Sequence, residues 1–301
     1  MSGVAVIGTG PVVQLVHLPA IARLGAPGPV AIAARDPERL RSLAEAEGLD
    51  SWWTDWRAML SEVRPDVVIV ATPDHLHAEM ALEAIRGGAH VLVEKPAVLR
   101  LEDGRELLRA AGDARRLVAV NMTLRLLPAT AALADMAARL RRPSFQVDYA
   151  VSPPAADRQR DADDDGLVRT IGVHAVDLVS HVAGDRVVSA QQRQSRPGEV
   201  QLALGLSRGA QGRCRLTYRE GGLQARMAVQ NGRLAELLLG PGNAWETRAD
   251  GRTVGRGRLW ADLVEYSAIE DLVVSVREGR EPAASLEEHL RLLEALAEAH
   301  S

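Results

Sequence analysis

The stretch DVVIVATPDHLHAEMALEAIRGGAHVLVEKP, residues 66–96, decides the fold of the first part of the chain. It begins with an almost wholly apolar run, continues with a helical pattern closed by Gly87 and Gly88, and ends with a second apolar run. Apolar strands of this kind are typical of a parallel sheet covered on both faces. The order strand, helix, strand therefore predicts a βαβ unit.

The same alternation continues on both sides of this unit. We expect further strands at 3–8, 30–34 and 117–121, and a helix over 35–48 that begins near Pro37 and ends at Gly48. Five strands that alternate with helices predict a doubly wound parallel sheet. We assign this first domain to residues 1–121.

The pattern changes after about residue 122. A helix leads into the strand FQVDYAV, and an acidic loop over 152–166 is followed by another helix. Short alternating strands then run from Val187 to about Arg248, and amphipathic helices follow around 258–278 and 285–299. We therefore predict an α/β protein whose second domain, residues 122–301, is an α+β domain with a large, mostly antiparallel sheet.

Composition narrows the classes of function. The chain has 301 residues, 47% hydrophobic residues and a net charge of -4, as in a globular protein of about two domains. Its cations are scattered among acids, so we expect no nucleic-acid partner, and no apolar run approaches the length of a membrane span. The N-terminus carries no secretory pattern, and we expect a cytoplasmic protein. A single cysteine excludes an intrachain disulfide.

A glycine-containing turn follows the first strand. In VIGTGPVV, Gly8 and Gly10 lie between the end of the strand and the start of the next helix, which begins with Pro11 and Val12. Backbone N–H groups at such a turn can hold a pyrophosphate, which predicts a dinucleotide site. Val13 replaces the third glycine of the usual fingerprint, so a tight strand-to-helix turn without a ligand is the alternative.

The end of the second strand, AIAARD, bears on the choice of cofactor. An acid is usual here and hydrogen-bonds the adenosine ribose, but this chain has Ala34 followed by Arg35. A guanidinium can bind a 2'-phosphate, which predicts NADP(H) in preference to NAD(H). The alternative is that Arg35 is solvated and Asp36 caps the following helix.

Lys95 is the only lysine among 36 lysine and arginine residues. It follows a strand at the edge of the sheet where ligands bind in doubly wound folds. An ammonium can exchange a proton at working pH, whereas a guanidinium stays protonated. Chance survival of one surface lysine is the alternative when Lys95 is considered alone.

Together the Gly-x-Gly turn, TPDHLH, VLVEKP and the later GVHAVD resemble the Gfo/Idh/MocA family of glucose-fructose oxidoreductase and inositol dehydrogenase. The resemblance is specific over residues 3 to about 130 and looser beyond. It implies a nicotinamide-binding Rossmann domain and a second domain whose sheet serves as an oligomer interface.

The resemblance also implies roles for single residues. Thr72, Pro73 and His77 would line the cofactor pocket, and Glu94 and Lys95 would lie beside the nicotinamide. A cis peptide would precede Pro96, which X-Pro bonds permit at little cost. Arg125, in NMTLRLLP, matches a family arginine near the same cleft.

The other half of the implied site departs from the family pattern. Family members carry Asp-x-x-x-His or Asp-x-x-x-Tyr on a helix, and this chain has Thr170 and His174 at that spacing. His174 would exchange a proton with the substrate, but threonine cannot stabilise an imidazolium as a carboxylate does. Asp177, one turn later, is a candidate substitute, although packing is the more usual role there. A structural role for His174 is the alternative.

Two metal-like patterns are interpreted as chance. Asp161, Asp163, Asp165 and Gly166 imitate a calcium loop, but Gly172 stands where the glutamate ligand is required. His75 and His77 are two residues apart and point to different sides of a helix. We therefore expect no metal site.

These observations predict an NADP(H)-dependent oxidoreductase that transfers hydride between nicotinamide and a secondary alcohol or ketone of a sugar-like or polyol-like molecule. Lys95 and His174 would move the proton, and Arg125, Thr170 and Asp177 would contact the substrate. Reduction of an imine or a conjugated C=C bond, and a non-catalytic NADP(H)-binding regulator or scaffold, are the alternatives. We expect a homodimer or homotetramer formed through the C-terminal sheet.

Overall fold

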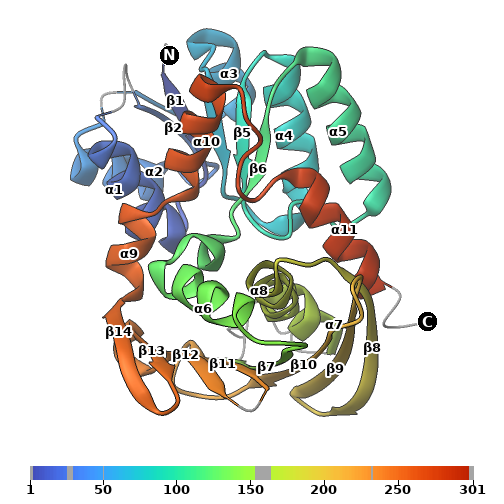
Figure 1. The fold of residues 1–301 in the computed structure, drawn as a ribbon. Coiled ribbons are helices and arrows are strands. Elements are labelled where there is room, and N and C mark those ends of the chain that lie inside the picture. Colours follow the sequence, from blue (N-terminus) through green and yellow to red (C-terminus); the bar gives the residue numbers. More distant parts are fainter. Residues whose placement is uncertain (1–2, 26–29, 50, 153–163, 232, 298–301) are drawn as a thin grey trace. The chain divides into compact units, whose positions relative to one another are not determined.

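The computed structural model of the chain describes residues 3–25, 30–49, 51–152, 164–231 and 233–297. They form two compact units, drawn in Figure 1. The first unit comprises Met1–Thr123 and Leu263–Leu290, and the second comprises Leu124–Asp262 and Arg291–Ser301. The sequence pattern placed one boundary between residues 121 and 122 and did not foresee the return of residues 263–290 to the first unit. That return depends on long-range contacts, which local periodicity does not record.

A parallel sheet of six strands lies at the centre of the first unit, in the order β3-β2-β1-β4-β5-β6. The strands are β1 (Val4–Ile7), β2 (Val30–Ala33), β3 (Trp52–Trp53), β4 (Val67–Val70), β5 (His90–Val93) and β6 (Val118–Val120). Residues of β1 and β4 are at most 4% exposed, as expected for strands covered on both faces. The predicted doubly wound sheet is confirmed. Strand β3 was missed because two residues, one of them the exposed Trp52, show no alternation.

Helices connect these strands across both faces of the sheet (Figure 1). They are α1 (Leu18–Arg23), α2 (Pro37–Glu47), α3 (Trp56–Val63), α4 (His77–Arg86) and α5 (Leu101–Ala114). Because such crossovers are right-handed, the reversal of strand order at β1 places α1 and α2 on one face and α3 to α5 on the other. The ends predicted for α2 are confirmed: Asp36 caps its first turn, and Gly48 ends it at φ 65°.

The carboxyl ends of the strands bring several predicted site residues to one edge of the first unit. Gly8 follows β1, Arg35 lies two residues after β2, Thr72 lies two residues after β4, and Glu94 follows β5 directly. Strands β1 and β4 are neighbours, and the order of strands reverses there. This is the position at which doubly wound sheets bind nucleotides.

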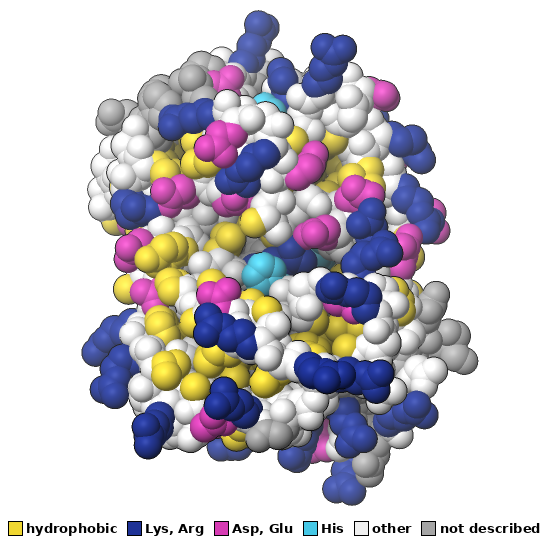
Figure 2. All heavy atoms as spheres, in the orientation of Figure 1, with side chains coloured by type: hydrophobic (Ala, Val, Ile, Leu, Met, Phe, Trp, Pro, Cys, Tyr) yellow, Lys and Arg dark blue, Asp and Glu magenta, His cyan; other side chains and the backbone are white. Residues whose placement is uncertain are grey.

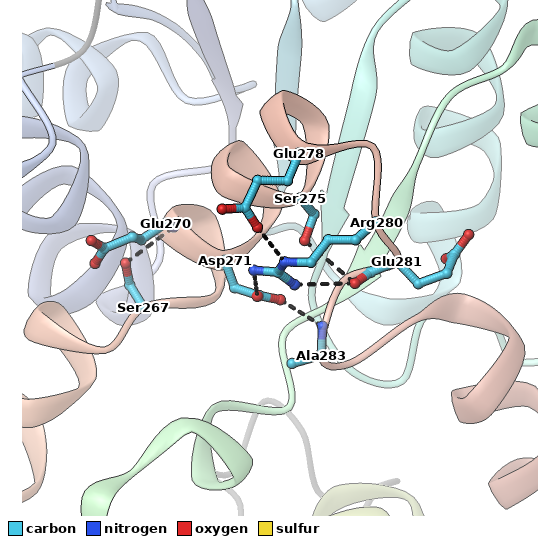
Figure 3. A network of polar contacts seen from close by, with 8 residues as sticks. All are labelled: Ser267, Glu270, Asp271, Ser275, Glu278, Arg280, Glu281 and Ala283. Atoms are coloured by element: carbon cyan, nitrogen blue, oxygen red, sulfur yellow. Dashed lines mark hydrogen bonds and ion pairs between the residues drawn. The ribbon is translucent and has the colours of Figure 1, made fainter.

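Residues 263–290 complete the first unit. Helix α10 (Ala268–Glu278) begins at Ser267, whose side chain accepts a hydrogen bond from the N–H of Glu270. Figure 3 shows the turn after α10, where the Arg280 guanidinium contacts Asp271 and Glu278 at 2.9 Å each. Asp271 also accepts from the N–H of Ala283 at 2.6 Å. This network holds the segment that adds to the edge of the sheet.

That segment pairs directly with β6. The N–H of Val120 donates to the carbonyl of Ala284 at 2.8 Å, and Ala119 and Ser285 form an antiparallel bridge. One helix was predicted over 258–278, but the structure has α9 (Leu259–Glu265) and α10, because Ser267 starts a new helix. Helix α11 (Leu286–Ala297) follows.

An eight-stranded sheet forms most of the second unit, in the order β14-β13-β12-β11-β7-β10-β9-β8. The strands are β7 (Ser144–Val151), β8 (Val187–Arg196), β9 (Glu199–Leu206), β10 (Gln211–Tyr218), β11 (Gln224–Gln230), β12 (Leu234–Leu239), β13 (Ala244–Ala249) and β14 (Arg252–Arg258). Every neighbouring pair is antiparallel except β7 and β10. The predicted large, mostly antiparallel sheet is confirmed.

The two faces of this sheet differ in chemistry. Helices α6 (Pro128–Ala138) and α8 (Val173–Ala183) pack on the face that carries apolar residues such as Val200 and Leu202 (Figure 1). The alternate residues point to the other face and form ion pairs between strands, including Arg215 with Glu199 at 2.8 Å. On the face drawn in Figure 2, cationic side chains are spread over the surface among acidic and hydrophobic side chains, and several of the cationic side chains are adjacent.

We expect Gly8→Ala to destabilise the protein by about 2 kcal/mol or more. Gly8 has φ 126°, and a Cβ there would overlap the carbonyl oxygen of Ala71. Gly10→Ala is the matched control, because a Cβ on Gly10 meets no described atom within 4 Å. Urea unfolding measures both variants. Equal stability of the two would contradict this account of the turn.

Candidate functional site

The glycine turn leaves open space above Gly10. The Gly8 N–H donates to the carbonyl of Ala33 at 2.8 Å, which fixes the turn against β2. The carbonyl of Gly10 accepts from the N–H of Val13 at 3.0 Å. A π-helical turn, Val13–His17, then precedes α1, with Val13 fully buried. Valine at the third position of the fingerprint is therefore part of the core, while Gly10 stays accessible to a ligand.

The carboxylate of Asp36 is used by its own helix. Its Oδ1 accepts from the N–H groups of Glu38 and Arg39, both at 3.1 Å. The predicted alternative, that Asp36 caps α2, is correct. Arg35 is exposed and makes no hydrogen bond or ion pair with the described residues. Sequence reasoning missed Arg39, whose Nη2 donates to the Thr9 carbonyl at 2.9 Å and so reaches the glycine turn.

The loop after β4 is tied to the loop after β5 by His77. Nε2 of His77 lies 2.7 Å from the carbonyl oxygen of Thr72, and Nδ1 lies 2.7 Å from that of Pro96. The ring is 1% exposed. The Thr72 hydroxyl donates to the sulfur of Met80 at 3.5 Å, and Pro73 begins a short 3-10 helix, Asp74–Leu76. The exposed His75 is on that short helix, apart from the buried His77.

Glu94 is partly buried beside Lys95, with its side chain 13% exposed, and accepts two hydrogen bonds on one oxygen. Oε1 accepts from Nε2 of His17 at 3.0 Å and from Nδ2 of Asn121 at 2.5 Å. Burial alone would raise the pKa of Glu94, but these donors and the charge of Lys95 outweigh it. The pKa of Glu94 therefore lies below its ordinary 4.5, and the group is an anion at neutral pH.

Lys95 precedes a cis peptide bond to Pro96, as the family resemblance implied. Burial lowers the pKa of its ammonium from the ordinary 10.5, and the negative charges of Glu94 and Asp74 oppose this only in part. The loop continues to Ala97, whose N–H donates to Nε2 of the buried His289 at 3.2 Å. A lysine with lowered proton affinity beside a fixed carboxylate can act as a proton donor or acceptor.

In the second unit, Arg125 and Asp177 form a buried ion pair. Nε and Nη2 of Arg125 lie 2.7 and 2.6 Å from Oδ1 of Asp177. Arg125 is 9% exposed and Asp177 is 2% exposed. Asp177 thus neutralises the arginine, which is the packing alternative considered for it. Its assignment as a substitute partner for His174 stays a prediction.

His174 is on α8, and its ring is parallel to that of Tyr149 on β7. The ring centroids are 6.2 Å apart, and the planes differ by 7°. Burial raises the pKa of Tyr149, so its hydroxyl keeps its proton. Thr170 is within the π-helical turn Val168–Gly172, which runs directly into α8. Its side chain, and the Asp161 and Asp163 of the calcium-like pattern, are outside the described residues.

Residues 2–122 match the family described as "Oxidoreductase family, NAD-binding Rossmann fold", GFO_IDH_MocA. The N-terminal domain of this chain belongs to the Gfo/Idh/MocA oxidoreductase family. The chain is 38% identical over 108 residues to D-glucoside 3-dehydrogenase of Escherichia coli (strain K12), with 36% of the chain and 31% of that relative covered. It is 34% identical over 163 residues to 1,5-anhydro-D-fructose reductase of Ensifer adhaerens, with 52% and 49% covered. The chain thus spans half or less of the length of these relatives.

A likeness in fold to solved structures extends over both units. A probable dehydrogenase from Thermotoga maritima superposes with a TM-score of 0.82 at 18% identity, covering 99% of this chain and 96% of the other. Within the part of the chain that the structure describes, no cluster of three or more His, Cys, Asp or Glu side chains is placed to bind a metal ion. No described helix is both long and apolar enough to cross a bilayer.

Sequence reasoning identified the Gfo/Idh/MocA motifs but, besides Arg39, missed three side chains that support them. His17 and Asn121 hold Glu94, and Tyr149 stacks on His174. Asn121 had a detectable signal, because it directly follows a buried strand at the same edge as Glu94. His17 and Tyr149 are single polar groups in apolar patterns, so the sequence gave no signal that they belong to the site.

Proposed function

We propose that this chain is an NADP(H)-dependent oxidoreductase acting on a secondary alcohol or ketone of a sugar-like or polyol-like small molecule. The observation that carries the proposal is the partly buried pair Glu94 and Lys95 at the carboxyl edge of a nucleotide-binding sheet. The names of two partial relatives, D-glucoside 3-dehydrogenase and 1,5-anhydro-D-fructose reductase, support a sugar-like substrate.

The residues present fit a dinucleotide. The open space above Gly10 would admit a pyrophosphate to the backbone N–H groups that begin the helix after β1. Thr72 and Pro73, two and three residues after the neighbouring β4, would flank the same cofactor, with Pro11 and Val12 on the glycine side. When bound, the nicotinamide supplies or accepts the hydride at its C4.

Lys95 would move the proton that accompanies the hydride. In reduction its ammonium would polarise the carbonyl and donate a proton, and in oxidation the amine would accept one. Glu94 would keep Lys95 in place, because His17 and Asn121 fix the carboxylate. We assign His174 as a second proton-exchanging group, and Arg125, Thr170 and Asp177 to the substrate.

The preference for NADP(H) over NAD(H) depends on Arg35. Its guanidinium is exposed two residues after β2, with no described partner to satisfy it, and Ala34 supplies no carboxylate to repel a phosphate. Asp36 is a weaker obstacle than its charge suggests, because the N–H groups of α2 occupy one of its oxygens. A 2'-phosphate would thus meet a free cation at this edge.

Assembly and location complete the proposal. The face of the second sheet that α6 and α8 leave uncovered would join copies into a homodimer or homotetramer. Cys214 is a buried free thiol, so the fold needs no oxidising compartment, and we propose a cytoplasmic enzyme.

We expect the purified protein to oxidise NADPH with a carbonyl from a panel of ketosugars, anhydrosugars and keto-polyols. Lys95→Arg should lower kcat about 100-fold or more, because arginine retains the charge but cannot release the proton. Titration of NADPH fluorescence is the control, and we expect the Kd of the variant to stay within about twofold.

Two outcomes would contradict this assignment. Near-normal turnover by Lys95→Arg would exclude the lysine as the proton donor. Tight NADPH binding without hydride transfer to any carbonyl or imine in the panel would instead favour a non-catalytic regulator.

We expect Arg35→Ala to raise the Kd for NADPH about tenfold or more and to leave the Kd for NADH nearly unchanged. Arg41→Ala is the matched control, since Arg41 is an exposed arginine on α2, the helix that follows Arg35, and its ion pair with Glu45 is at the 4.0 Å limit. Fluorescence titration with both cofactors gives the ratio of the Kd for NADPH to the Kd for NADH. A ratio equal to that of the wild type would show that Arg35 does not select the cofactor.

A further inference from the structure

Both ring nitrogens of His77 face groups that can only accept a hydrogen bond. Nδ1 is 2.7 Å from the carbonyl oxygen of Pro96, and Nε2 is 2.7 Å from the carbonyl oxygen of Thr72. A neutral imidazole carries one N–H, and its other nitrogen presents a lone pair. In either neutral tautomer, one of these short contacts would set two lone pairs against each other.

Turning the ring over does not remove the conflict. A rotation of 180° about the bond to the ring would place a C–H group at each carbonyl instead of a nitrogen. Carbon–oxygen contacts of this kind are about 3.3–3.6 Å long, well beyond the 2.7 Å observed. The two nitrogens therefore belong where they are, and each must carry a hydrogen.

We propose that His77 is held as an imidazolium and acts as a positioning residue that ties the loop after β4 to the loop containing Lys95. The ring is 1% exposed, so water does not compete for its two donors. Charge-assisted hydrogen bonds to two carbonyls offset the cost of burying the cation. The ring fixes Thr72 and Pro96 with one rigid group.

The charges around the ring balance this cation. The titratable groups on its own segment are Asp74, His75, Glu79, Glu83 and Arg86. Glu94 and Lys95 are on the facing loop, and His289 lies behind Ala97. Glu94 is an anion, and Asp74 is close enough to raise the proton affinity of Lys95. Nε2 of His289 accepts a hydrogen bond from Ala97, so that ring is not a second imidazolium. Two carboxylates, Asp74 and Glu94, thus accompany the two cations His77 and Lys95.

The consequence for the site rests on the proposed function. The cofactor would contact Thr72 and Pro73 on one side and Glu94 and Lys95 on the other. The His77 ring holds the two loops that carry these residues in a fixed position relative to each other. A fixed positive charge next to Pro96 also disfavours a second charge on Lys95. His77 would therefore help keep the lysine ready to release its proton.

The protonation of His77 is measured directly by long-range 1H–15N correlation from the ring C–H protons. These spectra report both nitrogens whether or not their protons exchange with water, and backbone connectivities in labelled wild-type protein assign the ring. At about pH 7.5 we expect both nitrogens of His77 to be protonated. The exposed His75, two residues earlier, is the internal reference. One unprotonated nitrogen on His77 would overturn the proposal.

The positioning role has its own test in His77→Gln, with His75→Gln as the matched control. The glutamine carboxamide is neutral and presents an oxygen as well as an NH2 group, so it cannot bridge both carbonyls as the ring does. We expect the Kd for NADPH to rise about tenfold in His77→Gln and to stay unchanged in His75→Gln. Equal affinities would refute the positioning role. The spectrum needs neither cofactor nor substrate, so it stands if the variant does not fold or if the proposed reaction is wrong.

Discussion

The partly buried carboxylate of Glu94 is the group around which the candidate site is organised. It lies at the end of β5, at the edge where doubly wound sheets bind ligands, and two side chains from other parts of the first unit donate to a single oxygen. His17 comes from the π-helical turn after the glycine loop, and Asn121 from the end of β6. One carboxylate therefore links the helical turn after the glycine turn, the loop containing Lys95 and the end of β6.

This arrangement explains why arginine would not serve at position 95. Burial disfavours the charged form of an ammonium and brings its proton within chemical reach, while Glu94 and Asp74 keep the group in place. A guanidinium at the same position would keep its proton at any working pH. The chain's one lysine is thus at the position where the proposed reaction requires an exchangeable proton.

Much of the first unit could be predicted because its strands and helix ends depend on residues that are close together in the sequence. Apolar strands, the Asp36 cap and the Gly48 end are visible in short windows of sequence. The contacts that build the site are not local: His17 is 77 residues from Glu94, and Ala284 pairs with Val120 across most of the chain. Periodicity finds such elements but does not report which of their polar side chains meet. In the second unit, the Arg125 and Asp177 pair and the Tyr149 stack were beyond prediction for the same reason.

The central claim is that a lysine with lowered proton affinity moves the proton during hydride transfer. The most direct test is the dependence of kcat/KM for carbonyl reduction on pH, because it reports the ionisations of the free enzyme. Reduction needs the protonated ammonium, so kcat/KM should fall as pH rises through the pKa of Lys95, at a pH below the ordinary lysine value of 10.5. The falling limb should be absent in Lys95→Arg. A limb that persists unchanged in that variant, or a wild-type profile that stays flat up to pH 10.5, would contradict the account.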